Sequence, residues 1–170
     1  VRAIRRCRRP VFAAVEGHAA GAGASIALAC DLIVAARDAR FAVAHVRLGI
    51  APDGGATLAL PRALPLQLAP EWLMTGAPMA AERLHAAGLV NRLAAPGETV
   101  ADAVRWAGEL AGQAPAALAA IKALVNHAAW PDLDAQLERE RDAFVSTMFE
   151  PASRALVAGF LESSRTKAAP

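Results

Sequence analysis

The glycine-rich turn Gly21-Ala22-Gly23-Ala24-Ser25 constrains the fold of this chain more than any other segment. It stands between two short apolar runs, 11–15 and 32–35, which predict buried strands. The small apolar residues 24–29 predict a helix that tolerates burial on all sides. The order strand, glycine turn, helix and strand indicates an α/β fold. The free N–H groups at the start of such a helix suit a developing negative charge.

A second cluster of small residues, Pro52-Asp53-Gly54-Gly55-Ala56-Thr57, follows later in the chain. A carboxylate at the start of a Gly-Gly turn is a candidate proton carrier, and that carboxylate is Asp53. Asp before a helical segment also commonly serves as its N-cap, here for a helix over 54–60. With the first cluster, the proton-carrier role predicts an oxyanion-binding turn and its acid/base partner. The residues alone leave the capping role open.

Length and composition predict one globular domain. The chain has 170 residues, of which 55% are hydrophobic and 20% charged, and its net charge is only +2. Much of the positive charge lies in the first nine residues, at Arg2, Arg5, Arg6, Arg8 and Arg9. We interpret these arginines as the end of a helix, since no aromatic side chain lies among them for stacking on bases. The sequence therefore predicts no nucleic-acid partner.

The cysteines and the longest apolar run bear on the compartment. Cys7 and Cys30 are isolated, without the spacing of a zinc site, and we expect both to be small buried residues in a reducing cytoplasm. The run Ala19–Cys30 is too short to cross a bilayer. These features predict a cytoplasmic protein with no membrane and no metal.

The coarse pattern divides the chain near Pro96-Gly97. Residues 1–96 form the α/β part, and residues 97–170 are expected to be helical. Further strands are expected at 41–43 and 89–93, and further helices at 80–87, 99–111, 116–126, 133–148 and 151–161. Thr99 is expected to cap the helix that it begins. The first strand arrives after only nine residues, which predicts that neighbouring strands are missing at the front.

Two phosphate-binding motifs do not fit the first cluster. Gly21-Ala22-Gly23-Ala24-Ser25-Ile26 has the first two glycines of a dinucleotide fingerprint but Ile26 in place of the third. A Walker A loop requires a lysine, which is absent here. Glycines that only allow close helix–strand packing would account for Gly21 and Gly23, but not for the residues around them.

A longer string of motifs resembles the enoyl-CoA hydratase/isomerase, or crotonase, family. The similar motifs run in register along the chain: Arg9-Pro-Val-Phe-Ala-Ala-Val-Glu-Gly17-His-Ala-Ala-Gly-Ala-Gly23-Ala-Ser-Ile-Ala-Leu-Ala-Cys-Asp31, Ala39-Arg-Phe41, Leu48-Gly49, Pro52-Asp-Gly-Gly55, Leu60-Pro-Arg62, Leu73-Met-Thr-Gly76 and Ala86-Ala-Gly-Leu-Val-Asn91. The resemblance implies a crotonase-like α/β spiral of β-β-α repeats with a helical C-terminal trimerisation region. It also implies that the N-terminal third of the domain is missing from this sequence.

The same resemblance implies the substrate and the partners. The expected substrate is an acyl-CoA thioester, and no separate cofactor is needed because coenzyme A is part of that substrate. A complete domain would form a homotrimer or a dimer of trimers. The family's second oxyanion donor lies on the missing segment, so the truncated chain is expected to be an impaired enzyme.

Catalytic roles follow from the resemblance at four positions. The backbone N–H of Ala22 corresponds to one oxyanion donor. Hydratases of the family have glutamates where this chain has Ser25 and His45, so water addition by two glutamates is not expected. Asp53 matches the carboxylate of the isomerase-like branch, which moves a proton from one carbon to another. That role predicts a raised pKa for Asp53, beside Ile50 and Leu58 in an apolar pocket.

Six residues are expected to line the substrate site: Gly21, Gly23, Ser25, His18, His45 and Gly54. Ser25 is expected to be a pocket wall rather than a nucleophile, because no base and orienting group accompany it. His45 is either a proton shuttle or a pocket-lining side chain. Asp31 is expected to be structural. Residues 138–142 are expected to be a solvated helix face or a trimer contact, with Glu138 and Arg141 paired.

Three functions remain open at this point. The first is an isomerase that shifts a double bond or rearranges a ring by proton transfer on a thioester enolate. The second is a hydratase or thioester hydrolase of the same family that uses His45. The third is a non-catalytic remnant that acts only through oligomerisation of its C-terminal helices.

Overall fold

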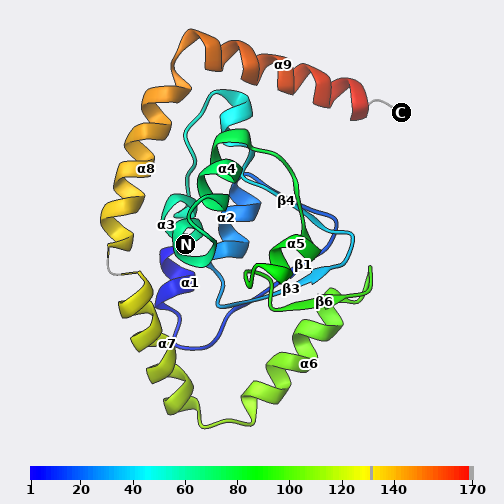
Figure 1. Ribbon diagram of the computed structural model, residues 1–170, viewed down its shortest axis with the longest axis vertical. Helices are drawn as coiled ribbons and strands as arrows, with labels where there is room; N and C mark the ends of the chain where they lie inside the picture. The colour runs from blue at the N-terminus through cyan, green and yellow to red at the C-terminus, as the bar shows by residue number, and fades with distance from the viewer. Residues whose placement is uncertain (131, 169–170) are drawn as a thin grey trace.

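A computed structural model describes residues 1–130 and 132–168, and these form two small β-sheets among helices (Figure 1). The strands are β1 (Phe12–Val15), β2 (His18–Ala20), β3 (Leu32–Ala36), β4 (Arg40–Ala42), β5 (Met79–Ala80) and β6 (Arg92–Ala94). The helices before β6 are α1 (Arg2–Arg6), α2 (Ala22–Ala29), the 3-10 helix η1 (Ala44–Leu48), α3 (Ala56–Ala63), α4 (Leu68–Thr75) and α5 (Ala81–Ala86). The helices after it are α6 (Thr99–Ala111), α7 (Pro115–Ala129), α8 (Leu133–Met148) and α9 (Pro151–Ala168).

The first sheet has the order β1-β3-β6, with both pairs parallel. The second has the order β2-β4-β5, in which β2 and β4 are parallel and β5 is antiparallel. The strands expected at 11–15 and 32–35 are therefore confirmed, and the one at 41–43 begins a residue earlier. The expected strand at 89–93 forms only over Arg92–Ala94. The strands β2 and β5 were not predicted, because two or three residues carry no detectable alternation.

The predicted helices over 99–111 and 133–148 have the bounds of α6 and α8. The helix expected at 24–29 begins two residues earlier, at Ala22, and the one expected from Gly54 begins at Ala56. At 80–87 the helix is α5, and it is followed by Gly88 in the left-handed conformation (φ +84°). Among the described residues, no helix is both long and apolar enough to cross a membrane.

The core is built largely from small side chains around α2, which packs against β2 and α3. Buried alanines dominate it, and Trp72 and Phe41 are its largest fully buried side chains. Small side chains allow helix and strand backbones to approach closely. The buried apolar alanines include Ala24, Ala27, Ala29, Ala35, Ala36, Ala39, Ala56, Ala59, Ala69 and Ala81.

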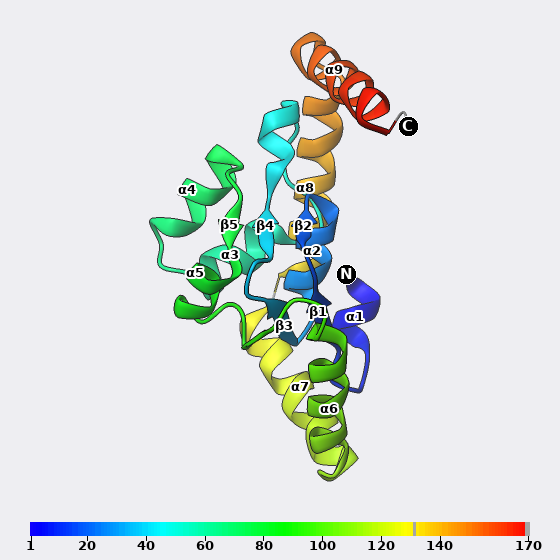
Figure 2. The ribbon, with the colours of Figure 1, turned by 90° about the vertical axis from the view of Figure 1, so that its right-hand side faces the viewer.

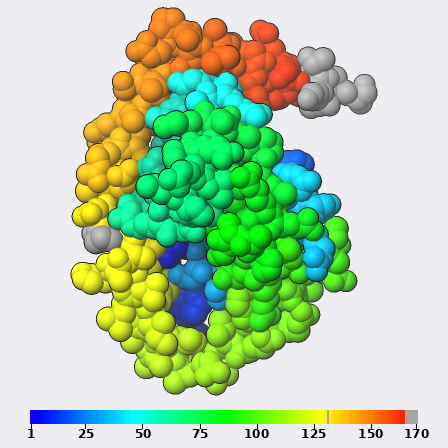
Figure 3. All heavy atoms as spheres, in the orientation of Figure 1, coloured from blue at the N-terminus to red at the C-terminus, as the bar shows by residue number. Residues whose placement is uncertain are grey.

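The C-terminal helices surround this core on three sides (Figures 1 and 2). Helix α6 packs on β1 and β3, α8 contacts α3, and α9 contacts η1. Figure 3 shows α7, in yellow, standing off from the green segments, with N-terminal residues in blue visible in the hollow between them. Because α6 packs closely on the first sheet, the packing does not separate residues 1–96 from residues 97–170. The division of the chain at residue 96 therefore stays a prediction.

The start of α6 is held by a carboxylate from far away in the sequence. Glu16, which follows β1, accepts hydrogen bonds from Gly97 N (3.1 Å), Thr99 N (3.1 Å) and Thr99 Oγ1 (2.6 Å). The hydroxyl and N–H bonds hold the pKa of Glu16 below its usual range. The expectation that Thr99 caps its own helix was wrong, because the N-cap is Glu98 and the Thr99 side chain bonds to Glu16 instead.

Asp31, at the start of β3, is the centre of a largely buried ion cluster, so its expected structural role is confirmed. Its carboxylate lies 2.6 Å from Lys122 Nζ and 3.4 Å from Arg5 Nη1, and it accepts a hydrogen bond from Val11 N (2.7 Å). Lys122 also donates to the carbonyls of Ile4 (2.9 Å) and Arg9 (3.0 Å). The cluster joins α1, β3 and α7. By contrast Cys7, expected to be buried, is exposed, and only Cys30 is buried.

Replacing Lys122 by Met tests this cluster. The variant removes the charge and leaves Asp31 and two carbonyls short of donors, so we expect the free energy of unfolding to fall by about 3 kcal/mol. Urea denaturation provides the measurement. The control is Arg141→Met, which breaks the exposed pairs with Glu138 and Asp142 and is expected to leave the free energy of unfolding almost unchanged. Equal losses in the two variants would contradict a stabilising role for the buried cluster.

Candidate active site

The two glycine clusters of the sequence meet in the structure, and η1 adds a histidine to them. His45 Nε2 lies 3.2 Å from Asp53 Oδ1. Ser25 Oγ donates a hydrogen bond to the carbonyl of Asp53 (3.0 Å) and lies 3.4 Å from the carbonyl of Gly21. A Cβ atom on Gly21 would lie 4.0 Å from His45 Nε2, and one on Gly54 would lie 2.6 Å from Ser25 Cβ. Five of the predicted site residues therefore form one cluster.

Local backbone geometry explains why these residues converge. Gly21 has a positive φ of 53°, and its N–H donates to Ala42 O (2.8 Å), which fixes the turn between β2 and α2 to the end of β4. After β4 the chain forms η1, which carries His45 and ends at Gly49 in the left-handed conformation. Ser25 is only 1% exposed, so its hydroxyl bonds to backbone rather than to solvent.

The other predicted residues lie at the rim of this cluster. Ala22 is exposed and is the first residue of α2. Its N–H is therefore one of the N–H groups at the helix start that have no intrahelical partner. Gly23 is also exposed, and open space lies where a Cβ would stand. His18 is exposed on β2 opposite Arg40, and no hydrogen bond among the described residues joins it to the cluster.

The expectation of a raised pKa for Asp53 in an apolar pocket was wrong. The structure lowers the pKa of Asp53 instead of raising it, because the hydrogen bond from His45 outweighs the opposing effect of partial burial. The carboxylate is 41% exposed, so the neighbouring apolar residues do not enclose it. The alternative capping role is not realised either, because the N-cap residue of α3 is Gly55. The carboxylate is therefore ionised and available.

His45 holds this carboxylate from a buried position, with a side chain only 9% exposed. Its Nδ1 atom is buried and has no hydrogen-bond partner in the part of the chain that the structure describes. The tautomer with the proton on Nε2 matches this arrangement, since Asp53 then accepts that proton and no buried N–H is left without an acceptor. Within the described residues, no group of three or more His, Cys, Asp or Glu side chains is arranged to hold a metal ion.

Sequence reasoning missed Glu140 on α8. The Glu138–Arg141 pair was predicted and is confirmed, but Glu140 does not share that solvated face. It is 4% exposed and accepts hydrogen bonds from Gly55 N (2.6 Å) and Thr57 N (3.0 Å). The signal was present in the helical spacing, because Glu140 falls in the same stripe as the partly buried Leu133, Leu137 and Phe144.

The close contact between Gly54 and Ser25 predicts a large effect of Gly54→Ala. Gly54 has φ +66°, so the variant suffers backbone strain of about 1–2 kcal/mol and a clash that adds about 1–3 kcal/mol. The matched control is Gly17→Ala, which has a similar φ of 61° and nothing within 4 Å of the added Cβ. Urea unfolding of both variants separates clash from strain. Equal destabilisation would show that Ser25 and Gly54 do not pack as closely as described.

Comparison with known proteins shows which family the sequence matches. The sequence matches the family description Enoyl-CoA hydratase/isomerase over residues 1–167. It is 45% identical over 114 residues to a carnitinyl-CoA dehydratase of Salmonella typhi, which covers 67% of this chain and 44% of that protein. The chain thus spans less than half of the length of the curated relatives it matches.

Solved structures of the same kind superimpose on nearly the whole chain. An enoyl-CoA hydratase from Polaromonas sp. JS666 has 47% identity and a TM-score of 0.74, covering 95% of this chain and 63% of that one. An enoyl-CoA hydratase from Mycobacterium avium subsp. paratuberculosis K-10 has 32% identity and a TM-score of 0.90, covering 95% of this chain and 66% of that one. The α/β architecture with its helical C-terminal region is the crotonase fold, and enzymes of this kind act on CoA thioesters without a separate cofactor. The chain belongs to the enoyl-CoA hydratase/isomerase family.

Proposed function

We propose that the protein catalyses isomerisation of an acyl-CoA thioester by moving a proton between two carbon atoms of the acyl chain. One observation carries the proposal: an ionised carboxylate, Asp53, is held by His45 beside the exposed start of α2. Asp53 is also the one carboxylate at the positions where the family resemblance implies catalytic acids, because Ser25 and His45 replace the two hydratase glutamates.

In this reaction the Asp53 carboxylate removes a proton from a carbon next to the double bond. The electron pair moves toward the thioester and forms an enolate, whose charge develops on the carbonyl oxygen. The N–H of Ala22 donates a hydrogen bond to that oxygen, and the helix dipole of α2 favours the same charge. The protonated Asp53 then returns its proton to a different carbon, so the double bond has moved and no atom is gained or lost.

The lowered pKa of Asp53 sets a condition on this step. A carboxylate with a low pKa is a weak base and therefore a poor proton acceptor. The low pKa that keeps Asp53 ionised at neutral pH thus also reduces its strength as a base. Substrate binding removes water from the half-exposed carboxylate, and desolvation raises the pKa of a carboxyl group. The hydrogen bond from His45 orients the carboxylate while this happens.

A homotrimer is part of the proposal. The C-terminal helices carry exposed apolar side chains that a monomer leaves in water, and subunit contacts would cover them. These include Val145, Met148, Phe149, Leu156, Phe160 and Leu161.

Asp53→Asn in the full-length protein tests the isomerase. The amide cannot accept the proton but keeps the shape of the side chain, so we expect kcat for double-bond migration on 3-enoyl-CoA substrates to fall by about 10²–10⁴-fold. KM should change little, because Asp53 takes part in the chemical step. Turnover equal to that of the parent protein would overturn the assignment of Asp53.

A second candidate is hydration or dehydration, which the carnitinyl-CoA dehydratase relative and the position of His45 favour. His45→Phe separates the two candidates. If His45 handles water, hydration of a 2-enoyl-CoA should fall about 10²-fold, and isomerisation should fall less, because Asp53 itself carries the proton. For the remaining isomerisation, we expect the acid limb of kcat/KM to move to higher pH, because Asp53 loses the hydrogen bond that lowers its pKa. Equal loss of both activities would contradict separate roles.

A further inference from the structure

The segment that carries Asp53 is fastened along its length to the C-terminal helices. Ser153 Oγ on α9 donates to the carbonyl of Gly49 (2.7 Å). Ala51 N donates to Thr147 Oγ1 on α8 (2.9 Å), and Gly55 N donates to Glu140 Oε2 on α8 (2.6 Å). The three fastened residues Gly49, Ala51 and Gly55 lie on both sides of Asp53, so its backbone cannot shift without breaking one of these bonds.

Glu140 makes the largest share of these contacts. Besides Gly55 N, it accepts hydrogen bonds from Thr57 N (3.0 Å) and from the Thr57 hydroxyl. Gln136 Nε2 donates to the same hydroxyl oxygen (2.6 Å), so Thr57 is held from two positions on α8. An ionised carboxylate only accepts hydrogen bonds, and it can therefore satisfy three donors at the start of α3 at once.

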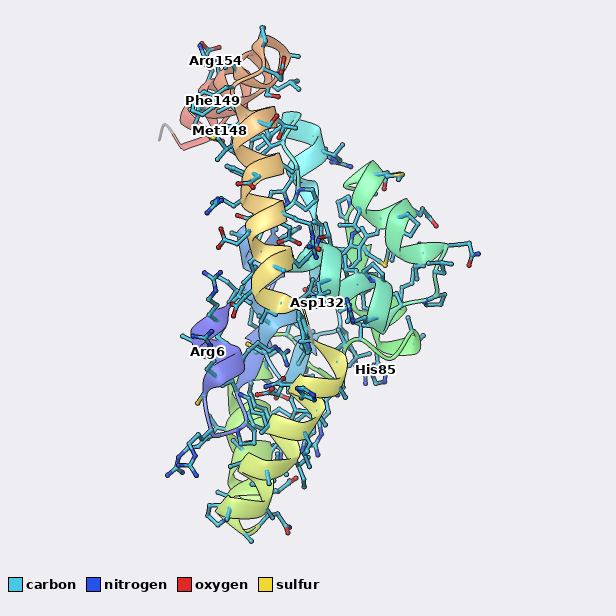
Figure 4. The ribbon with its side chains drawn as sticks, turned by 90° about the vertical axis from the view of Figure 1, so that its left-hand side faces the viewer. Arg6, His85, Asp132, Met148, Phe149 and Arg154 are labelled. Atoms are coloured by element: carbon cyan, nitrogen blue, oxygen red, sulfur yellow. The ribbon has the colours of Figure 1, made fainter. Side chains whose placement is uncertain are left out.

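The side chains that hold the segment share one face of α8. Glu140 and Thr147 are seven residues apart, which is two turns of a helix, and Gln136 lies one turn before Glu140. Figure 4 shows α8 as a continuous rod between the labelled Asp132 and Met148. A single straight helix thus holds one end of the segment at Ala51 and the other at Gly55 and Thr57.

The backbone between Asp53 and α3 needs such a support. Gly54 and Gly55 both have positive φ, at 66° and 83°, and two glycines in succession have unusual conformational freedom. Fixing the N–H groups of Gly55 and Thr57 removes that freedom immediately after Asp53. On the other side of the segment, a Cβ on Gly49 would lie 2.6 Å from Ser153 Oγ, so the fit there is also close.

We propose that Glu140 is a positioning residue for Asp53, and that it places the Asp53 carboxylate against His45 by holding the Gly54-Gly55 turn. The inference rests on the proposed function in one respect only, the role of Asp53 in proton transfer. Thr147 and Ser153 support the same segment with neutral hydrogen bonds and have smaller effects.

Kinetics of Glu140 variants in the full-length protein test the proposal. A displaced reacting group costs up to about 10²-fold in rate, so we expect Glu140→Ala to lower kcat by about 10–10²-fold with KM for the acyl-CoA within about twofold. Glu140→Gln keeps one carbonyl acceptor but turns its NH2 group toward one of the backbone N–H donors, so it should recover only part of kcat. The matched control is Asp142→Asn, an exposed residue two positions further along α8, which should behave as the parent protein. A lower melting temperature with unchanged kcat would show that Glu140 is only structural.

A second readout does not depend on any reaction. The carboxyl resonance of Asp53, identified by its loss in Asp53→Asn, is titrated by ¹³C NMR in the parent protein and in Glu140→Ala. The groups that face the turn are the His45 ring from η1, the neutral Ser25 from α2 and Glu140 itself. We expect the pKa of Asp53 to rise in Glu140→Ala as its carboxylate leaves His45. An unchanged titration in the folded variant would overturn the proposal.

The experiments distinguish failure of the proposed isomerase from failure of the positioning role of Glu140. If Asp53→Asn keeps its turnover, the proposed isomerase is wrong, while the titration still decides whether Glu140 positions Asp53. If Glu140→Ala does not fold, Glu140→Gln takes its place, because it removes the charge and one acceptor oxygen but keeps the other. The expected change is then a fall in kcat of about three- to tenfold with a small rise in the pKa of Asp53. No change in either quantity would overturn the proposal.

Discussion

Hydrogen bonds from distant backbone N–H groups to three carboxylates hold this structure together. Asp31 joins the N-terminal segment to α7, Glu16 holds the start of α6, and Glu140 holds the start of α3. Each of these carboxylates satisfies backbone donors that the strands and helices themselves leave unpaired. Because a core rich in alanine contributes little apolar area per residue, these polar contacts decide how the C-terminal helices sit on the α/β part.

The candidate site depends on the same arrangement. Helix α2 offers its N-terminal N–H groups, η1 offers His45, and the turn before α3 offers Asp53. Ser25 links α2 to the backbone of Asp53, so the His45–Asp53 pair and the start of α2 are positioned by adjoining parts of the fold. The electrostatics of the pair follow from geometry: hydrogen bonding to His45 favours the charged carboxylate more strongly than partial burial disfavours it.

Much of the fold was predictable from local sequence. Helices α6 and α8 carry apolar periodicity, strands β1 and β3 are short apolar runs, and Gly21 and Gly88 mark turns that require a positive φ. The burial of Cys7, the cap at Thr99 and the pKa of Asp53 were wrong because each depends on a partner distant in sequence or on exposure. Glu140 was missed for the same reason: its neighbours in the sequence are charged, and the donors that it satisfies lie 85 and 83 residues away.

These separations have a consequence for how the protein is made. A ribosome synthesises the Asp53 turn long before α8, so the turn must wait for roughly another eighty residues before Glu140 can reach it. Contacts of long sequence separation form late, since the entropy of closing the loop is lost before the contact is gained. The nascent α/β part therefore emerges before Glu140 restrains Gly54 and Gly55, and the candidate site reaches its final shape only when the last helices dock.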